Sequence, residues 1–211
     1  MTAQAGGAFP FLSPREARRR LRALRRGLPD HERQAAERAI HRTLGRMRVW
    51  QPGRRVAAFI GMPGEVDLRP CFETAWSRGV RLYVPRILSL RHGAMTFVPF
   101  HRDAPLRPNE FGIDEPVTSP RDRVSALLLD TILVPLVGFD RAGHRLGMGA
   151  GFYDRALRRR LDRTQSFRRP RLVGIAYAIQ QVDRIEPAPW DVALDAVVTE
   201  RGLLTFDSPS S

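Results

Sequence analysis

The sequence predicts an α/β fold in which helices cover both faces of an open, mostly parallel sheet, as in Rossmann-like proteins. Three observations lead to this prediction. Short apolar segments alternate with amphipathic ones along most of the chain. The segment from Leu127 to Pro135 is almost entirely apolar, as a strand buried on both faces should be. The stretch from Val56 to Val84 has the order strand, loop, helix, strand, which is typical of a right-handed parallel crossover.

A single domain is expected over residues 13–206. The chain has 211 residues, which is long enough to bury a substantial core, and 43% of them are hydrophobic. Residues 1–12, which contain several glycines and alanines, and residues 207–211 are expected to be disordered tails.

Two helices are expected at the N-terminus, packed as a pair on one face of the sheet. The first begins with Ser13 as N-cap and Pro14 in the first helical position, and it ends near Gly27. Its apolar row is formed by Ala17, Leu21, Leu24 and Leu28. A basic row beside it is formed by Arg18, Arg22 and Arg25. The second helix is expected from about Asp30 to Val49.

The remaining elements follow from apolar runs and from the turn residues between them. Strands are expected at residues 56–60, 80–84, 95–99, 127–135, 172–177 and 196–199, and helices at residues 68–78 and 152–163. Residues 100–126 are proline-rich and irregular, and a segment of that length is more often functional than idle. Within it, Asp114 and Glu115 are expected to order the loop rather than to act as an acid or a base.

The basic side chains are all arginines, 35 in number, and the formal net charge is +13. Residues 1–55 carry fourteen arginines against four acidic residues, so most of the excess lies in the N-terminal quarter. A guanidinium group binds two oxygens of a phosphate or carboxylate at once. A polyanionic partner is therefore indicated: a nucleic acid, a nucleotide or a polyglutamate tail. A general preference for arginine on solvated helix faces would explain part of the same excess.

Membrane and secreted proteins do not fit this sequence. The longest apolar stretches are too short to span a bilayer, and residues 1–10 lack the basic and apolar regions of a secretory signal. The single Cys71 excludes an intramolecular disulfide and fits a reducing compartment. A cytoplasmic protein without a membrane partner is therefore expected. Cys71 itself is expected to be a small buried apolar residue at the start of a helix.

The most informative segment runs from Phe139 to Asp154, directly after the strand at 127–135. Three glycines stand at every second position: Gly147, Gly149 and Gly151. They let backbone amides come close to a ligand, and the start of the next helix adds further N–H donors. Arg145 supplies a fixed positive charge, and Asp154 supplies a carboxylate for a cation on the same phosphates. The segment therefore predicts an anion cradle.

Two common nucleotide-binding loops do not match this segment. A Walker A loop needs a Gly-Lys-Ser/Thr sequence, which is missing here. A dinucleotide-binding loop has a different glycine spacing and an acidic residue at the end of a second strand. A flexible turn that binds nothing would explain the three glycines alone, whereas the flanking Arg145, Tyr153 and Asp154 favour the cradle.

This segment resembles the signature of the 5-formyltetrahydrofolate cyclo-ligases, also called 5,10-methenyltetrahydrofolate synthetases. The matching positions are Phe139, Asp140, Gly143, Arg145, Leu146, Gly147, Gly149, Gly151, Tyr153 and Asp154. Between about Pro14 and Glu200, further segments resemble that family in the same order: residues 65–67, 83–86, 95–97, 111–116, 173–177, 190–191 and 197–200. Agreement of several spaced motifs is more specific than any single one.

The resemblance implies an enzyme that converts 5-formyltetrahydrofolate to 5,10-methenyltetrahydrofolate, with ATP as co-substrate and Mg²⁺ as cofactor, and that releases ADP and phosphate. The formyl oxygen would be phosphorylated first. Arg145 and Tyr153 would be catalytic. By resemblance, ATP would be bound by Pro14, Arg15, Arg18, Arg145, Leu146, Gly147, Met148, Gly149, Ala150, Gly151, Phe152 and Tyr153.

The same resemblance implies a metal site and a folate site. Asp154 and Asp191 would hold the magnesium ion. The folate would be contacted by Ile60, Glu65 and Phe111, with Glu65 accepting hydrogen bonds from the pterin.

The chain departs from the family at two places where members often carry a lysine. It has Pro14-Arg15 at the start of the first helix and Ala150 in the glycine-rich turn. Arg15 can replace the first charge, whereas Ala150 cannot replace the second. Phosphate charge would then be met by Arg145, magnesium and the N-terminal arginines.

The sequence lacks the common motifs for a protein nucleophile or a zinc ion. This is compatible with phosphoryl transfer, which needs positioning and charge stabilisation more than a protein nucleophile. There is no plausible Ser/His/Asp set and no His/Cys spacing typical of zinc. The five histidines lie in polar segments and are expected to face solvent.

Two other functions stay open. An arginine-rich RNA-binding protein would explain the basic row, but aromatic residues are only 8% of the chain and are not interleaved with the arginines, which argues against a nucleic-acid partner. A catalytically silent relative that binds folate would explain Ala150.

Overall fold

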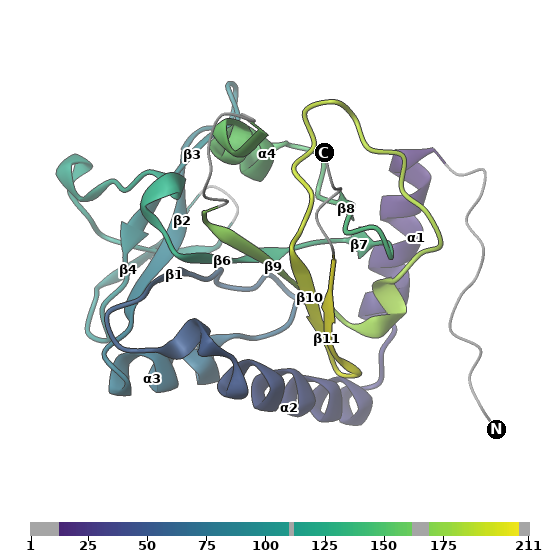
Figure 1. Ribbon diagram of the computed structural model, residues 1–211, viewed down its shortest axis with the longest axis horizontal. Helices are drawn as coiled ribbons and strands as arrows, with labels where there is room; N and C mark the ends of the chain where they lie inside the picture. Colours follow the sequence, from purple (N-terminus) through teal and green to yellow (C-terminus); the bar gives the residue numbers. More distant parts are fainter. Residues whose placement is uncertain (1–12, 110–111, 162–168, 207–211) are drawn as a thin grey trace.

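The computed structural model describes residues 13–109, 112–161 and 169–206, so both expected tails lie outside the described residues. At its centre is a seven-stranded sheet with the strand order β11-β10-β9-β6-β1-β2-β3 (Figure 1). These strands are β1 (Arg55–Ala57), β2 (Arg81–Ser89), β3 (Ala94–Pro99), β6 (Thr131–Pro135), β9 (Arg171–Ile175), β10 (Ala196–Thr199) and β11 (Gly202–Thr205).

The sheet is parallel in its interior and antiparallel at both edges. β1 pairs in parallel with β2 and β6, and the parallel pairing continues from β6 through β9 to β10. The outer pairs, β2 with β3 and β10 with β11, are antiparallel. The expected open, mostly parallel sheet is thus confirmed. β11 was not anticipated, because its residues are mostly exposed and carry no buried alternating pattern.

Four α-helices accompany the sheet in the described part of the chain. Figure 1 shows α2 and α3 against one face and α4 on the opposite side, so the expected cover on both faces is confirmed. The helices are α1 (Pro14–Arg26), α2 (Asp30–Arg46), α3 (Arg69–Ser77) and α4 (Phe152–Leu157). The 3₁₀ turns are η1 (Arg48–Trp50), η2 (Pro120–Asp122), η3 (Ala126–Leu128), η4 (Arg158–Leu161) and η5 (Ala178–Gln180). The small hairpins pair β4 (Leu106–Pro108) with β5 (Asp114–Pro116), and β7 (Gly138–Phe139) with β8 (Arg145–Leu146).

The start of α1 is as predicted. Ser13 is the N-cap, and its hydroxyl accepts a hydrogen bond from the Glu16 amide at 3.3 Å. The Glu16 carboxylate in turn accepts from the Ser13 amide at 2.9 Å, which completes a capping box. With Pro14 in the first turn, these groups fix where the helix begins.

The two N-terminal helices do not lie as a pair on one face, and this part of the expected architecture is wrong. α2 packs against α3, β10 and β11, whereas α1 packs against η5, beside the carboxyl ends of β6 and β9 (Figure 1). Leu21 anchors α1 in a small separate cluster with Val137, Leu146 and Val182. Ala17, Leu21 and Leu28 of the expected apolar row do pack against apolar clusters. Leu24 does not, since it is 38% exposed, and Arg25 of the expected basic row is instead buried, at 4%.

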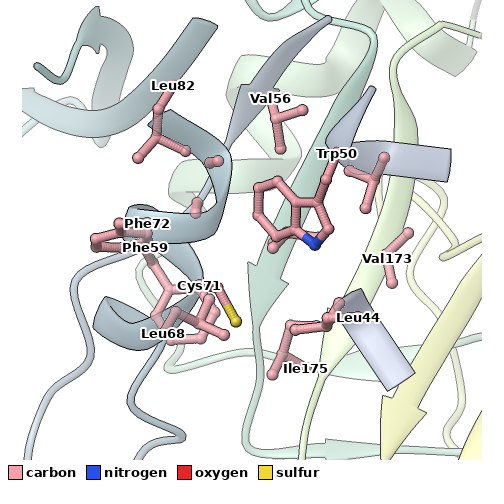
Figure 2. Close-up of a cluster of buried hydrophobic side chains, with 14 of the residues drawn as sticks. Leu44, Trp50, Val56, Phe59, Leu68, Cys71, Phe72, Leu82, Val173 and Ile175 are labelled. Atoms are coloured by element: carbon pink, nitrogen blue, oxygen red, sulfur yellow. The ribbon is translucent and has the colours of Figure 1, made fainter. Parts of the chain in front are cut away.

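Two apolar layers hold the sheet between its helices, because side chains of a strand point alternately to opposite faces. Along β6, Leu133 belongs to the layer on the α2 and α3 side, while Ile132 and Val134 belong to the other layer. Figure 2 shows the first layer, in which Trp50 and Cys71 lie among side chains of the strands and helices. The expected burial of Cys71 is confirmed.

Several element ends differ from the sequence prediction. β6 begins only at Thr131, because the Asp130 carboxylate accepts the Arg55 amide at 2.9 Å and Arg169 Nη1 at 2.9 Å, and residues 126–128 form a 3₁₀ turn. The helix expected at 152–163 is α-helical only to Leu157; it continues as η4, and its last two residues lie outside the described ones. α2 ends at Arg46, β1 at Ala57 and β9 at Ile175.

The strand order creates a position where ligands can bind. β1 lies at the point where the order reverses, with β2 on one side and β6 on the other. The segments that follow β1 and β6 therefore leave the sheet in different directions. Open α/β sheets bind ligands at the carboxyl ends of such strands, and both sequence-predicted half-sites follow them.

Alanine should be tolerated at Gly45 and not at Gly174. A Cβ at Gly174 in β9 would lie 2.7 Å from Leu136 Cδ2 and 2.8 Å from Leu194 Cδ1, so Gly174→Ala should lower the free energy of unfolding by about 1–3 kcal/mol. A Cβ at Gly45 in α2 meets nothing within 4 Å. Gly45→Ala should therefore raise the free energy of unfolding, by up to about 1 kcal/mol. Urea unfolding of both variants checks this, and a similar change in both would contradict it.

Candidate active site

The loop after β1 carries two of the expected folate residues. The Glu65 amide donates to the Met62 carbonyl at 2.8 Å, and Glu65 Oε2 accepts the Met62 amide at 3.1 Å. Gly64 has a φ of +86°, which side-chain-bearing residues rarely adopt. Ile60 is partly buried and packs against the apolar layer shown in Figure 2. This tight turn therefore fixes the place of the Glu65 carboxylate.

Glu65 is paired with a residue that was not assigned to the site. Arg25 Nη1 lies 3.5 Å from Glu65 Oε1, and the two side chains are only 5% and 8% exposed. Burial raises the pKa of Glu65 and lowers the pKa of Arg25, because each charged form loses hydration, and the charge of the partner opposes both changes. The pair thus joins α1 to the loop after β1.

The hairpin of β7 and β8 is organised by the buried carboxylate of Asp140. This carboxylate accepts the amides of Ala142, His144 and Ile185, each at 2.9 Å, and lies 3.0 Å from His144 Nδ1. The expectation that His144 faces solvent is wrong, since it is partly buried in this pair. Asp140 and His144 therefore shape the chain that leads into the glycine-rich turn.

The glycine turn, residues 147–151, is held by α1. Arg18 Nε donates to the Gly147 carbonyl at 2.8 Å. A Cβ at Gly149 would lie 3.6 Å from Arg18 Cζ, and Gly149 has a φ of +105°. The structure thus brings Arg18 and the glycine turn together, as expected for residues that share a ligand.

Arg155 holds the glycine turn from the other side. It donates to the Ala150 carbonyl and, at 3.1 Å, to the Gly93 carbonyl in the turn between β2 and β3. A Cβ at Gly93 would overlap the Arg155 guanidinium, so this contact requires glycine. Arg155 is a second residue that was not assigned from the sequence.

The helix after the glycine turn is shorter than expected. α4 has six residues and begins after Gly151, which makes no side-chain capping bond. So short a helix contributes a small dipole. A phosphate at this turn would therefore depend on positive side chains nearby, of which Arg18 and Arg145 are the expected ones.

Arg145 and Asp154, expected to bind phosphate and magnesium respectively, form an ion pair with each other. Arg145 also donates to the Val192 carbonyl, and the Val192 amide donates to Asp154 Oδ1 at 3.2 Å. Asp191, the neighbouring residue, accepts the Ala188 amide at 2.9 Å. The loop before β10 therefore brings both expected metal ligands to the same part of the structure.

Tyr153 follows the glycine turn in α4, and charges from both expected half-sites act on it. Burial raises the pKa of its hydroxyl, the negative charge of Glu65 raises it further, and Arg145 opposes this. Both charges are therefore near enough to act on the phenol. Tyr153 stays protonated over the physiological range and can serve as a hydrogen-bond donor.

The carboxylates of this region fit a magnesium ion that is also bound by substrate phosphates and water. Among the described residues, no group of three or more His, Cys, Asp and Glu side chains could hold a metal ion by itself. Magnesium is usually held by one or two carboxylates together with substrate phosphates and water. Asp154 and Asp191 match that pattern, so the residues present fit a magnesium ion that arrives with a nucleotide.

Other expected site residues are more dispersed. Pro14 and Arg15 are exposed in the first turn of α1, one turn before Arg18. Leu146 is buried in the cluster that anchors α1, so its side chain has a packing role. Phe111 lies outside the described residues.

The remaining expected ATP residues line the same turn and the start of α4. Met148 and Ala150 are exposed, and Phe152 is partly buried. The expected loop-ordering role of Glu115 is supported, because its carboxylate accepts Asn109 Nδ2 at 2.8 Å.

Comparison with known proteins identifies the family. The model of the 5-formyltetrahydrofolate cyclo-ligase family matches residues 12–200. This chain belongs to that family. The resemblance seen in the sequence is thereby confirmed, and this cyclo-ligase family member is an enzyme of the ligase class, as expected.

Individual relatives of this family member match over most of their length. The chain is 35% identical over 184 residues to the 5-formyltetrahydrofolate cyclo-ligase of Escherichia coli K12, covering 85% of this chain and 96% of the relative. The enzyme of the same name from Mycolicibacterium smegmatis is 30% identical over 205 residues, covering 92% and 100%. The solution structure of Aquifex aeolicus 5,10-methenyltetrahydrofolate synthetase is similar with a TM-score of 0.78 and 30% identity, covering 95% and 96%. No helix in the described part of this family member is long and apolar enough to cross a membrane.

The raised pKa of Glu65 should make stability depend on pH. Glu65 holds its proton more tightly in the folded state. Its contribution to stability is therefore fully present below the unfolded pKa of about 4.3 and is lost as the pH rises through the higher folded pKa. Glu65→Gln removes this titration, so the stability of the variant relative to wild type should increase as the pH rises from about 4.3 toward neutral.

Urea unfolding across that pH range measures the difference. Glu186→Gln is the matched control, because the Glu186 side chain is 76% exposed. A Glu65→Gln difference that does not change with pH would contradict the shifted pKa.

Proposed function

We propose that this cyclo-ligase family member converts 5-formyltetrahydrofolate to 5,10-methenyltetrahydrofolate in the cytoplasm, with ATP converted to ADP and phosphate. The observation that carries the proposal is that one helix, α1, bridges two loops at the reversal of strand order. The Glu65 loop follows β1, and the glycine turn follows β6 through the β7–β8 hairpin. α1 contacts both of them, through Arg25 and Arg18.

The chemistry needs a better electrophile than a formamide. In the proposed reaction the formyl oxygen attacks the γ-phosphorus of ATP, and the bond from that phosphorus to ADP breaks. The neighbouring folate nitrogen then attacks the activated formyl carbon, and the ring closes. Phosphate leaves with the former formyl oxygen, and the attacking nitrogen loses its proton. No protein nucleophile is required.

Arginines and the glycine turn would bind the triphosphate. Arg18 lies against the turn at Gly147 and can reach a phosphate beside it. Arg145 is 5% exposed, so its charge acts in a poorly hydrated environment, where electrostatic stabilisation is strong. We assign it a catalytic role on the transferring phosphoryl group. Asp154 and Asp191 would hold magnesium, which when bound would neutralise part of the phosphate charge.

The folate would lie toward the loop after β1. Glu65 can accept hydrogen bonds from the N–H groups of the pterin, and Ile60 offers an apolar contact at the start of the same loop. Tyr153, held protonated between Glu65 and Arg145, can donate a hydrogen bond to an oxygen of the substrate. We propose that this donor acts where the formyl group and the phosphate meet.

The proposed activity is tested by mixing the purified protein with 5-formyltetrahydrofolate, ATP and Mg²⁺ and following the absorbance of the methenyl product. Product should form only with all three components. A protein that binds folate without turnover would be the silent relative instead. A melting temperature raised by RNA and not by ATP with Mg²⁺ would favour the RNA-binding alternative.

Asp154→Asn and Asp191→Asn should each lose most of the turnover while remaining folded. Each substitution keeps the shape of the side chain and removes a charge that magnesium requires. Asp191→Asn is the cleaner test, because Asp154→Asn also breaks the pair with Arg145. Asp183→Asn, at an exposed position of the loop between β9 and β10, is the matched control. Wild-type turnover of either site variant at excess Mg²⁺ would show that the metal assignment is wrong.

Glu65→Gln should weaken folate binding and leave nucleotide binding nearly unchanged. The loss of a charge-assisted hydrogen bond costs about 1.5–3 kcal/mol, which corresponds to a rise in Kd of roughly 10-fold to 150-fold. Calorimetric titration of each ligand separately gives both values. An equal loss for ATP and folate would point to a general structural role for Glu65.

A further inference from the structure

One face of α1 contacts both proposed half-sites. Arg18 donates to the Gly147 carbonyl at 2.8 Å, and Arg25, seven residues later, is paired with Glu65 and donates to the Leu136 carbonyl at 3.4 Å. Residues seven apart in an α-helix lie on the same side, about 10 Å from each other along the axis. Leu21 lies between them, and a Cβ at Gly138 would come within 2.7 Å of its Cδ1. α1 therefore spans from the nucleotide side to the folate side.

Arg25 is buried with incomplete hydrogen bonding, which is unusual for a residue with a purely structural role. Its side chain is 5% exposed, yet its Nε has no hydrogen-bond partner. Its distance to Glu65, 3.5 Å, is long for a charge-assisted hydrogen bond. A buried arginine with incomplete partners destabilises a fold relative to an apolar residue of similar volume. Its presence at an inward position of α1 is explained if its charge acts on Glu65.

The apolar docking of α1 is small. Its anchor Leu21 belongs to a cluster with Val137, Leu146 and Val182, separate from the two apolar layers of the sheet. Leu24, on the same helix, is 38% exposed. Segments with little apolar burial undock at low free-energy cost. The docked state of α1 can therefore be favoured by ligands that need Arg18 or Arg25 in place.

We propose that Arg25 is a positioning residue that holds the Glu65 carboxylate ionised and oriented for the folate, and that α1 thereby couples folate binding to nucleotide binding. The proposal rests on the proposed function. Whichever ligand binds first stabilises the docked α1, so the second ligand binds to a helix already in place. Coupling of this kind is reciprocal, so each ligand raises the affinity for the other by the same factor.

The test measures the Kd of 5-formyltetrahydrofolate by calorimetry, with and without a non-hydrolysable ATP analogue and Mg²⁺. In the wild type the nucleotide should lower that Kd by about fivefold or more. The coupling ratio is the Kd without nucleotide divided by the Kd with nucleotide. In Arg25→Met, which keeps an unbranched stem and removes the charge, this ratio should fall to about one. Arg19→Met, at an exposed position of α1, is the matched control and should keep the wild-type ratio.

A second measurement separates positioning from general packing. Without Arg25 the carboxylate of Glu65 is harder to ionise, so the pH below which folate affinity declines should move upward in Arg25→Met. Arg25→Lys retains a charge without the planar fork. It should restore part of the coupling ratio and part of the wild-type pH dependence of folate affinity. If Arg25→Met does not fold, a full wild-type ratio and pH profile in Arg25→Lys would overturn the assigned role of the Arg25 fork.

Two results would overturn the proposal. One is a wild-type ratio of one in a protein that binds both ligands and forms product, which leaves the proposed function intact and removes the coupling. The other is a folded Arg25→Met with the wild-type ratio and pH profile. Absence of folate binding and of product in the wild type would instead overturn the proposed function itself.

Discussion

The position of β1 at the reversal of strand order is the constraint on which the rest of the site depends. Because β2 pairs on one side of it and β6 on the other, the segments after β1 and β6 separate at the carboxyl edge. The Glu65 loop, the glycine turn and the loop before β10 all contribute to that region. α1 then packs against this edge instead of joining α2 on a face, so it contacts both the Glu65 loop and the glycine turn.

Buried charge is the second feature of this region. Arg25 with Glu65 and Arg145 with Asp154 each form a largely buried ion pair. Such pairs contribute little net stability, because desolvation offsets most of their attraction. Their effect is to fix charged groups in a place where water does not screen them, as a reaction that develops charge on phosphate requires. One member of each pair, Glu65 and Arg145, acts on the pKa of Tyr153, which follows the glycine turn.

The sequence patterns predicted individual elements better than their ends or partners. The Ser13 cap located the start of α1, because a capping box involves only residues three apart. The apolar run at 127–135 located β6 but not its first residue, because residues 126–128 form a 3₁₀ turn and the Asp130 carboxylate accepts the Arg55 amide. The row of Ala17, Leu21, Leu24 and Leu28 suggested an apolar face for α1. The placement of Arg25 depends on a glutamate forty residues later, which helical periodicity does not report.

By itself, the sequence determined the α/β class, the family and the chemical types of the site residues, because all three depend on local patterns and spaced motifs. Only the tertiary structure decided which of those residues meet. Arg145 and Asp154 are nine positions apart and were expected to bind different groups, yet they bind each other. Arg25 pairs with Glu65, forty positions away, and Arg155 donates to the Gly93 carbonyl, because the segments around them come together at one edge of the sheet. Ion pairs between distant segments depend on distance in space, and the order of residues along a chain does not encode that distance directly.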